Sequence, residues 1–372
     1  MKVLILGANT GNGHRAVMRA IYDNFCKKNI SVEMFPDFYE NLYESNQILS
    51  DFYNMAQARS MELGVLLNEI MITEGQNRRE KLYNLFKKNL NDFFENNPCD
   101  IVISVSSLIN YHIIRFIKEN THSKKLRFYI VVTDPYKPLY PGFDIVGATA
   151  YFCPTEISKM QLEEAGIDKD IIHVLGYPID SNYFYKNDTS PDYVKNKYGI
   201  TKDRVVMINC GVSGSMSFLN LVKRLVNENP DIYFLILCGR NNTLYRIIAN
   251  TFKSVQNNYK VFDFTENMKE LYIISDLCIT KPGANTIFES IITNTLPIIY
   301  NFEGLMYQER GIFEFLKEII GIDLKFSDMD SLCKYISNDL NDVEFKRLRK
   351  NLEMYTQLDA AREIVEHILK RI

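Results

Sequence analysis

Short runs of strand character alternate with segments of helical spacing along most of this chain, and this alternation limits the fold more than any other feature. Alternating strands and helices are typical of βαβ units, which build parallel sheets. In the first half we predict strands at Lys2–Gly7, Ser31–Pro36, Ile101–Val105, Phe128–Thr133, Ala150–Cys153 and His173–Leu175. The pattern then restarts and predicts a second parallel sheet from Val205–Cys210, Tyr233–Cys238, Tyr259–Phe262, Leu277–Thr280 and Pro297–Tyr300.

The chain is long enough for two domains. Its 372 residues, 46% of them hydrophobic, can fill two cores of ordinary size. The segment Gly176–Asp192, GYPIDSNYFYKNDTSPD, is polar and turn-rich without periodicity, which is typical of a linker. We therefore predict an α/β fold with two Rossmann-like domains, residues 1–178 and 179–354. The closing helix, 355–372, has an apolar face that can dock back on the first domain.

Residues Asn41–Phe94 form a helical stretch larger than a doubly wound domain requires. Apolar side chains recur there at helical spacing, and no strand pattern interrupts them. Packing between helices is the default explanation for such residues. The alternative is an apolar flap that binds an acceptor molecule.

The overall charge argues against nucleic acid as a partner. The formal net charge is −3, so the protein as a whole presents no positive field to a phosphate backbone. Between Gln76 and Arg127, however, Lys and Arg outnumber Asp and Glu. A solvated helix face is the ordinary explanation, and a small patch for an anionic surface is the alternative.

The cysteines and the N-terminus indicate the cell compartment. The seven cysteines form no CxxC pair, and several lie in apolar runs, as small buried residues do. The opening MKVLILGA is too short for the core of a signal peptide, and no run reaches the length of a membrane-spanning helix. We expect a reduced, cytoplasmic protein. If it acts on lipid, it does so from the surface, as a peripheral protein on the inner face of the cell membrane.

A glycine-rich turn, GANTGNGH, follows the first predicted strand and precedes a helix, where backbone N–H groups can approach an anion. Its glycines, Gly7, Gly11 and Gly13, do not form GxGxxG, and the GK[ST] of a P-loop is absent. His14 lies in the first helical turn, whose positive end favours a neutral ring able to accept a proton. The alternative is a histidine that only lines a tight turn. The other histidines lack ligand spacing, so no metal site is predicted.

Two further glycine turns occur in the second half. NCGVSGSMS follows a predicted strand, and TKPGANTIFES follows another. In the latter, Asn285 or Thr286 is expected to cap the helix that begins there. Glu289 would lie one turn beyond Asn285, where its carboxylate can accept both hydroxyls of a ribose while the helix N-terminus binds a diphosphate. The small residues of the former turn are Gly211, Ser213 and Gly214.

Five segments taken together resemble one family of glycosyltransferases. They are GANTGNGHRAVMRAI, VVTDP, YFCPTEISKMQLEEAGIDKDIIHVLGYPI, ENMKELYIISDLCITKPGANTIFESIITNTLPIIY and YQE. The family contains the monogalactosyl- and processive glucosyl-diacylglycerol synthases, and it is related more distantly to the peptidoglycan N-acetylglucosaminyltransferase that makes lipid II. The resemblance runs in order from Met1 to about Phe315 and is most specific in the last third.

The resemblance implies a glycosyltransferase B architecture, in which two Rossmann-like domains face a cleft. The C-terminal domain would hold a UDP-sugar, and the N-terminal domain would hold the acceptor. Transfer of the hexose would invert the anomeric centre by direct displacement without a metal ion, so no cofactor is expected beside the UDP-sugar substrate. Diacylglycerol or a related lipid is the leading acceptor.

The resemblance also assigns site residues. His14 would face the reacting centre as general base, and Asp134, at the end of the strand YIVVTD, competes for that role. Glu289 resembles the carboxylate that binds the ribose. The other donor-binding residues are Gly11 and Gly13 beside the diphosphate or sugar, Gly211, Ser213 and Gly214 in the second turn, Arg240, Phe264 and Met268 near the base, Gly283, Ala284, Asn285 and Thr286 at the diphosphate, and Gln308 and Glu309 at the sugar hydroxyls.

The chain departs from the family pattern on both the donor and the acceptor side. Ala284 stands where a second glycine is usual, and LMYQE replaces a proline and glycine before the Gln-Glu pair. Neither the usual histidine nor the usual tryptophan follows Thr133 and Asp134. The last departure concerns the acceptor, so a soluble acceptor such as a peptide or a natural product is the alternative. A sugar-nucleotide epimerase or hydrolase and a non-catalytic sugar-nucleotide-binding protein are the other hypotheses.

Overall fold

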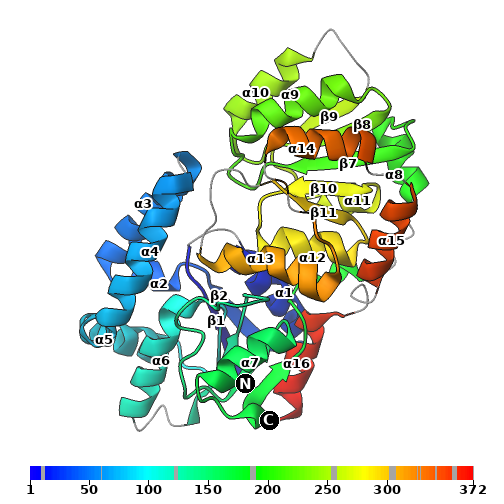
Figure 1. Ribbon diagram of the computed structural model, residues 1–372. Coiled ribbons are helices and arrows are strands. Elements are labelled where there is room, and N and C mark those ends of the chain that lie inside the picture. Colours follow the sequence, from blue (N-terminus) through cyan, green and yellow to red (C-terminus); the bar gives the residue numbers. More distant parts are fainter. Residues whose placement is uncertain are drawn as a thin grey trace. The chain divides into compact units, whose positions relative to one another are not determined.

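The computed structural model describes residues 1–9, 13–59, 61–120, 125–184, 190–252, 258–300, 307–324, 326, 328–339, 342–353 and 358–371. It divides into two compact units (Figure 1). The first unit comprises Met1–Ser181, Gly304–Ile312 and Leu358–Ile372, and the second comprises Asn182–Glu303 and Phe313–Gln357. Each unit is built on one parallel β-sheet.

Within the described residues, the sheet of the first unit has six strands in the order β2-β1-β3-β4-β5-β6. The predicted strands of the first half are confirmed, with ends that shift by no more than about two residues. Most side chains of β1, β3, β4 and β5 are buried, as expected for parallel strands covered on both faces. The strands are β1 (Lys2–Leu6), β2 (Ser31–Phe35), β3 (Ile101–Ser104), β4 (Arg127–Val131), β5 (Ala150–Cys153) and β6 (Ile172–Val174).

The helical stretch predicted at Asn41–Phe94 is confirmed, and it begins within the short helix α2. Its last helix, α5, packs Tyr83, Phe86 and Leu90 into the core over the sheet, while α3 and α4 pack against each other (Figure 1). Among the described residues, no helix combines the length and apolar character needed to cross a bilayer. The helices of this unit are α1 (Gly13–Lys27), α2 (Phe38–Leu42), α3 (Glu44–Arg59), α4 (Met61–Asn77), α5 (Arg79–Asn96), α6 (Ser107–Glu119), α7 (Glu156–Glu164) and α16 (Ala360–Lys370).

The described part of the second unit has a five-stranded sheet in the order β11-β10-β7-β8-β9. The predicted strands of the second half are confirmed. They are β7 (Arg204–Asn209), β8 (Ile232–Leu237), β9 (Tyr259–Phe262), β10 (Leu277–Thr280) and β11 (Leu296–Ile299). The helices are α8 (Pro191–Tyr198), α9 (Phe218–Glu228), α10 (Asn242–Thr251), α11 (Met268–Ile273), α12 (Ala284–Ile292), α14 (Met329–Lys334) and α15 (Asp342–Leu352), while α13 (Arg310–Glu314) spans the boundary between the units.

The strand order of the second sheet creates a switch point beside its first strand. From β7 the chain proceeds outward to β8 and β9, and then returns to β10 on the other side of β7. Asn209 and Thr280, the last residues of β7 and β10, are partners in register, so the turns that follow them begin at the same edge. In open parallel sheets ligands bind at this edge, beside such a switch point.

The boundary between the units lies at Ser181 and Asn182, within the segment predicted as a linker. Ser181 accepts a hydrogen bond from Asn24 at 2.7 Å and donates one to Asp359 at 2.9 Å, which ties the end of the first segment to the start of α16. The sequence placed residues 179–181 and 304–312 in the second domain. The structure groups both segments with the first unit. The side-chain contacts of Ser181 connect residues 179–181 to that unit.

Candidate functional site

The turn after β7 contains two glycines in the left-handed region. Gly211 has a φ of 80° and Gly214 a φ of 65°. A Cβ on Gly214 would overlap the carbonyl oxygen of Cys238, and Asn241 Nδ2 donates to the Gly214 carbonyl oxygen at 2.7 Å. A Cβ on Gly211 would meet no atom within 4 Å. Gly214 is therefore required for packing between two loops, whereas Gly211 and the exposed Ser213 leave the turn open.

The turn after β10 leads directly into α12. Gly283 has the N-cap position without a side-chain cap, and Ala284 begins the helix. The prediction that Asn285 or Thr286 caps this helix is wrong, because the helix starts before both residues and places them in its first turn. A Cβ on Gly283 would meet no atom within 4 Å. Since the N–H groups of a first helical turn have no partner within the helix, an anion can approach them here.

Glu289 lies on α12 one turn after Asn285. Asn285 Nδ2 donates to Glu289 Oε1 at 3.4 Å, and both residues are partly exposed. Asn285 Oδ1 is buried and has no hydrogen-bond partner within the described part of the chain. The partly exposed Glu289 carboxylate, held by the Asn285 amide, is therefore an acceptor suited to hydroxyl groups.

Arg240 and Phe264 come together at the surface of the second unit. The Arg240 guanidinium lies 4.7 Å from the ring centroid of Phe264, whose side chain is 43% exposed. The Arg240 N–H donates to the Val212 carbonyl oxygen at 2.7 Å, which holds this segment against the turn after β7. Met268, the first residue of α11, packs against the core of this unit instead. An exposed ring beside a cation can stack on a planar base.

In the first unit, α1 begins at Gly13 and His14 follows in its first turn. Gly11 lies outside the described residues, and a Cβ on Gly13 would meet no atom within 4 Å. Burial lowers the pKa of His14, and a hydrogen bond with the Ala8 backbone only partly opposes this effect. Among the described residues His14 Nδ1 is buried without a hydrogen-bond partner. The ring is therefore neutral at pH 7, which is the form that accepts a proton.

Asp134 is a buried carboxyl group just beyond the end of β4. Its Oδ2 accepts a hydrogen bond from the Tyr140 N–H at 2.6 Å, and its carbonyl oxygen accepts one from Ser158 Oγ at 2.7 Å. Burial raises the pKa of Asp134 to about 7, although the hydrogen bond from Tyr140 lowers it. A carboxyl group that titrates near neutral pH can accept or release a proton under physiological conditions.

His14 and Asp134 follow strands of the same sheet, β1 and β4, with β3 between them. At a strand spacing of roughly 4.8 Å, the two strand ends lie about 10 Å apart. The structure therefore places both predicted bases at one edge of the first sheet. Within the described residues, no group of three or more His, Cys, Asp or Glu side chains is arranged to hold a metal ion.

Gln308 and Glu309 belong to a short 3-10 helix, Tyr307–Glu309, that the structure groups with the first unit. The neighbouring Arg310 forms an ion pair with Glu69 of α4 at 2.7 Å, which anchors the segment there. The sequence had assigned the pair to the C-terminal domain. The side chain of Gln308 lies outside the described ones, and Glu309 is partly exposed.

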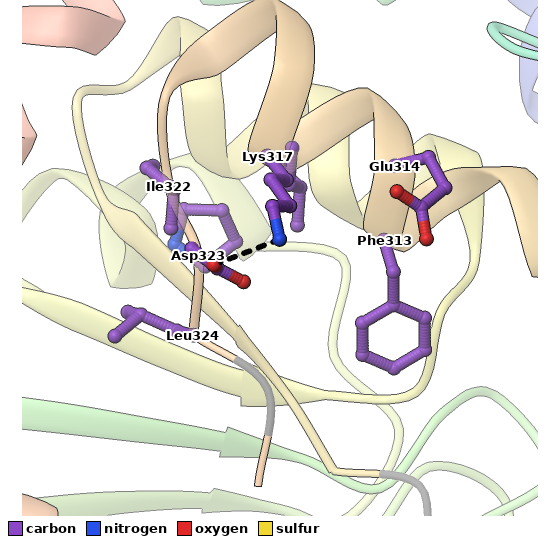
Figure 2. Close-up of a pocket in the computed structure, with 8 residues that line it drawn as sticks. Phe313, Glu314, Lys317, Ile322, Asp323 and Leu324 are labelled. Carbon is purple, nitrogen blue, oxygen red and sulfur yellow. Dashed lines mark ion pairs between the residues drawn. The ribbon is translucent and has the colours of Figure 1, made fainter.

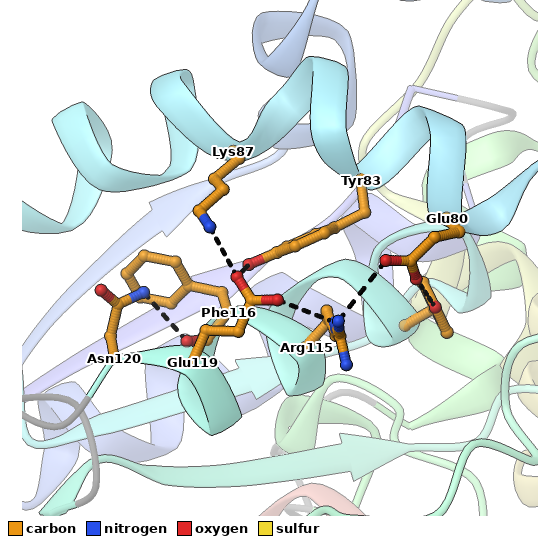
Figure 3. Close-up of polar contacts among 8 residues, drawn as sticks. Glu80, Tyr83, Lys87, Arg115, Phe116, Glu119 and Asn120 are labelled. Carbon is orange, nitrogen blue, oxygen red and sulfur yellow. Dashed lines mark hydrogen bonds and ion pairs between the residues drawn. The ribbon is translucent and has the colours of Figure 1, made fainter.

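Two members of the basic excess between Gln76 and Arg127, Lys87 and Arg115, are engaged in local ion pairs. Glu119 accepts hydrogen bonds from Lys87 Nζ at 2.8 Å and from the Tyr83 hydroxyl at 2.9 Å (Figure 3). Arg115 joins this group and also reaches Glu80 at 3.5 Å. Because these charges are partly exposed and already paired, they favour the solvated helix face over a patch for an anionic surface.

A small hollow occurs elsewhere in the second unit, beside β11 (Figure 2). Lys317 and Asp323 form an ion pair there at 3.1 Å. None of the predicted donor-binding residues lines it, so we assign it no part in the site. The lining residues are Pro297, Phe313, Glu314, Leu316, Lys317, Ile322, Asp323 and Leu324.

The helices α3 and α4 expose apolar side chains whose orientation the sequence could not assign. These side chains recur three or four residues apart along each helix, so each helix carries an apolar stripe. Ile48 is 65% exposed and Leu66 is 54% exposed. Soluble monomers rarely expose large apolar patches without a binding function. We call these residues the hairpin surface: Ile48, Leu49, Phe52 and Met55 on α3, and Leu63, Leu66 and Ile70 on α4.

Two family models match the chain, one in each half. Residues 14–179 match the monogalactosyldiacylglycerol (MGDG) synthase model, and residues 205–368 match the glycosyltransferase family 28 C-terminal domain. The processive diacylglycerol beta-glucosyltransferase of Bacillus pumilus is 22% identical over 379 residues, which cover 100% of this chain and 95% of that protein. The enzyme of the same name from Bacillus cereus strain AH820 is 26% identical over 384 residues, with 99% and 93% covered.

Solved structures with the same fold include proteins in complex with sugar nucleotides. The UDP-GlcNAc 2-epimerase from Neisseria meningitidis, bound to UDP-GlcNAc, matches with a TM-score of 0.61 at 16% identity and 100% coverage of both chains. HepE from Anabaena, in complex with UDP-glucose, matches with a TM-score of 0.56 at 11% identity, also over the full length of both. At these identities the likeness establishes the two-domain glycosyltransferase B fold and no more.

Proposed function

Because the chain belongs to the glycosyltransferases that join an MGDG synthase domain to a family 28 C-terminal domain, we propose that it transfers a hexose from a UDP-sugar to a lipid hydroxyl, that of diacylglycerol or a related lipid. The single observation that carries the choice of a lipid is the hairpin surface. The donor site and the proton acceptor are proposed from the turns and buried groups described above.

The donor would bind to the second unit. Its diphosphate would lie at the N-terminus of α12, where Gly283 leaves space and the helix dipole favours negative charge. Glu289 would accept hydrogen bonds from the ribose hydroxyls, and Asn285 would support that carboxylate. The exposed Phe264 ring with Arg240 would flank the base.

The reaction would be a direct displacement. The acceptor oxygen attacks the anomeric carbon, the bond from that carbon to the diphosphate oxygen breaks, and UDP leaves. The configuration of the anomeric carbon is thereby inverted. A base takes the proton of the attacking hydroxyl, and the helix N-terminus stabilises the charge that grows on the leaving diphosphate. His14 and Asp134 are the two candidates for the base. Neither step needs a bound metal, so we propose a metal-independent enzyme.

The acceptor would be a lipid because the hairpin surface exposes apolar side chains where a soluble enzyme has no need of them. The relatives from Bacillus are named for diacylglycerol, which agrees with an apolar acceptor. Contact with the membrane surface through the first unit follows from the same observation. A soluble acceptor, or epimerisation of the sugar nucleotide as in one structural neighbour, would leave this surface unexplained.

The test is formation of a glycolipid. Purified protein with EDTA is incubated with a labelled UDP-hexose and diacylglycerol in mixed micelles, with UDP-glucose, UDP-galactose and UDP-GlcNAc compared. We expect labelled lipid from one of the three, and none from the Glu289→Ala variant at low donor concentration. Turnover of the sugar nucleotide without any acceptor would instead indicate an epimerase or hydrolase.

A further inference from the structure

The backbone of Asn9, which lies within the first glycine turn, is held by side chains of α2 and α3. The Asn9 N–H donates to Glu40 Oε1 at 3.0 Å, and the Asn9 carbonyl oxygen accepts from Asn54 Nδ2 at 2.8 Å. Both polar groups of one peptide residue are thus satisfied by side chains from α2 and α3, far away in the sequence. These two contacts hold Asn9 in place within the connection from β1 to α1.

Glu40 is placed to do this with little freedom. Glu40 is 2% exposed. Its Oε1, which accepts from the Asn9 N–H, also accepts a hydrogen bond from Ser50 Oγ at 2.6 Å. Within the described residues Glu40 Oε2 is buried without a hydrogen-bond partner. A buried carboxyl group without a cation costs folding free energy, so its contacts with Asn9 and Ser50 are the gain that offsets this cost.

The same helices hold the segment that carries Glu309. Asn68 of α4 is 2% exposed, and its Oδ1 accepts from the Tyr307 N–H at 3.4 Å while its Nδ2 donates to the Tyr53 hydroxyl of α3 at 3.3 Å. On α3, Asn54 faces Asn9 while its neighbours Phe52 and Met55 are exposed on the hairpin surface. One pair of helices therefore combines an outer apolar surface with inner polar contacts to two candidate site segments.

We propose that Glu40 and Asn54 are positioning residues for transfer: they fix Asn9, whose neighbour Ala8 forms a backbone hydrogen bond with His14, and they link this segment to the helices of the hairpin surface. The inference rests on the proposed function, because its kinetic test requires transfer. Small errors in the placement of a reacting group can cost about 100-fold in rate. Loss of either contact should therefore lower turnover without weakening donor binding, which the second unit provides.

The kinetic test compares E40A, N54A and the conservative E40Q with a control, Q47A, which removes an exposed contact to Asp51 on the same helix. We expect kcat for transfer to diacylglycerol to fall at least tenfold in E40A and N54A, with the Kd for UDP within twofold of wild type. E40Q keeps an oxygen acceptor for Asn9 and Ser50, so its kcat should stay within about threefold. Equal losses in E40Q and E40A, or in Q47A and N54A, would overturn the proposal.

A second measurement does not depend on transfer. Hydrogen–deuterium exchange of a peptide covering residues 8–16 is followed by mass spectrometry in the same full-length variants. Exchange should become several times faster in E40A and N54A, and it should match wild type in E40Q and Q47A. Unchanged exchange in E40A and N54A would refute the positioning role. If wild type formed no glycolipid while exchange still changed as expected, only the proposed function would fail.

Discussion

The two units use similar sheets and place different chemistry at the ends of their strands. In the second unit the turn after β10 leaves the N-terminus of α12 open, and the partly exposed Glu289 lies one helical turn further on. In the first unit the corresponding edge carries two titratable groups, the partly exposed His14 and the buried Asp134, whose pKa values burial shifts in opposite directions. Open backbone donors suit anion binding, and buried titratable groups suit proton transfer. We therefore expect changes in the second unit to alter donor affinity and changes in the first to alter turnover.

The largest expected effect is on turnover and comes from the first unit. His14→Ala should lower kcat by about 10²- to 10⁴-fold, because a positioned proton acceptor typically contributes that much. The Kd for UDP should stay within twofold, since the donor site lies on other residues. Glycolipid formation at saturating donor and calorimetric titration with UDP measure the two quantities. If UDP affinity fell as much as turnover, the division of roles between the units would be wrong.

The matching change in the second unit should act on affinity. Glu289→Ala should weaken UDP binding by about 10- to 100-fold, because hydrogen bonds to a charged group contribute roughly 1.5–3 kcal/mol. At saturating donor, kcat should change less than threefold. Glu270→Ala is the control, because Glu270 is a carboxylate of the same unit paired with Lys197 at 2.7 Å. An equal loss of affinity in the control would remove Glu289 from the site.

The pH dependence of the rate distinguishes the two candidate bases. A base acts in its deprotonated form, and burial raises the pKa of Asp134 to about 7. With Asp134 as base, kcat/KM should rise about tenfold between pH 6 and pH 8 and then level off. With His14 as base, whose pKa burial lowers, the rise should lie at lower pH and the rate should level off earlier. Because the His14→Ala prediction takes His14 as the base, we expect the rate to level off at the lower pH; a tenfold rise between pH 6 and pH 8 that Asp134→Asn abolishes would assign the proton to Asp134.

The hairpin surface should affect only the lipid acceptor. Replacing Phe52 and Leu66 together by serine should lower the rate on diacylglycerol micelles about fivefold, because less apolar area would be available for burial against lipid. UDP affinity should not change. Leu85→Ser is the matched control, because Leu85 is 50% exposed on α5, outside the hairpin surface. A similar loss in this control would show that the effect is not specific to the surface.

Two glycines of the second unit should separate stability from binding. Gly214→Ala should lower the free energy of unfolding by about 2 kcal/mol, since it has a positive φ and its Cβ would overlap Cys238. Gly283→Ala should leave stability within about 0.5 kcal/mol and weaken UDP binding instead. Urea unfolding and UDP titration of both variants test this difference. Equal destabilisation would mean that both turns serve packing.

The sequence predicted the strands and the glycine turns well, because periodicity and turn chemistry are local properties of the chain. The capping rule predicted the start of α12 too late. It favours a polar N-cap and therefore pointed to Asn285 or Thr286, whereas the N-cap is Gly283. The raised pKa of Asp134 depends on burial, which no local pattern reveals. His14 was selected by its place in the first helical turn after the glycines and Asp134 by family resemblance, and their shared sheet edge follows from strand order.

Contacts between segments far apart in the chain could not be predicted from the sequence. Glu40 and Asn54 have no motif that links them to Asn9, and their contacts exist only because α2 and α3 return to the end of β1. The apolar residues of Asn41–Phe94 were visible, but helical spacing does not decide which of them the core covers. The assignment of Tyr307–Glu309 to the first unit likewise depends on contacts with α4.

The most direct measurement is calorimetric titration of the wild-type protein with UDP, with ADP and GDP in parallel and EDTA present throughout. We predict that UDP binds and that the other two nucleotides bind at least tenfold more weakly. The Kd for UDP should stay within twofold of wild type in His14→Ala and rise about 10- to 100-fold in Glu289→Ala. Absence of UDP binding to the wild type, or equal binding of all three nucleotides, would contradict a UDP-sugar site in the second unit.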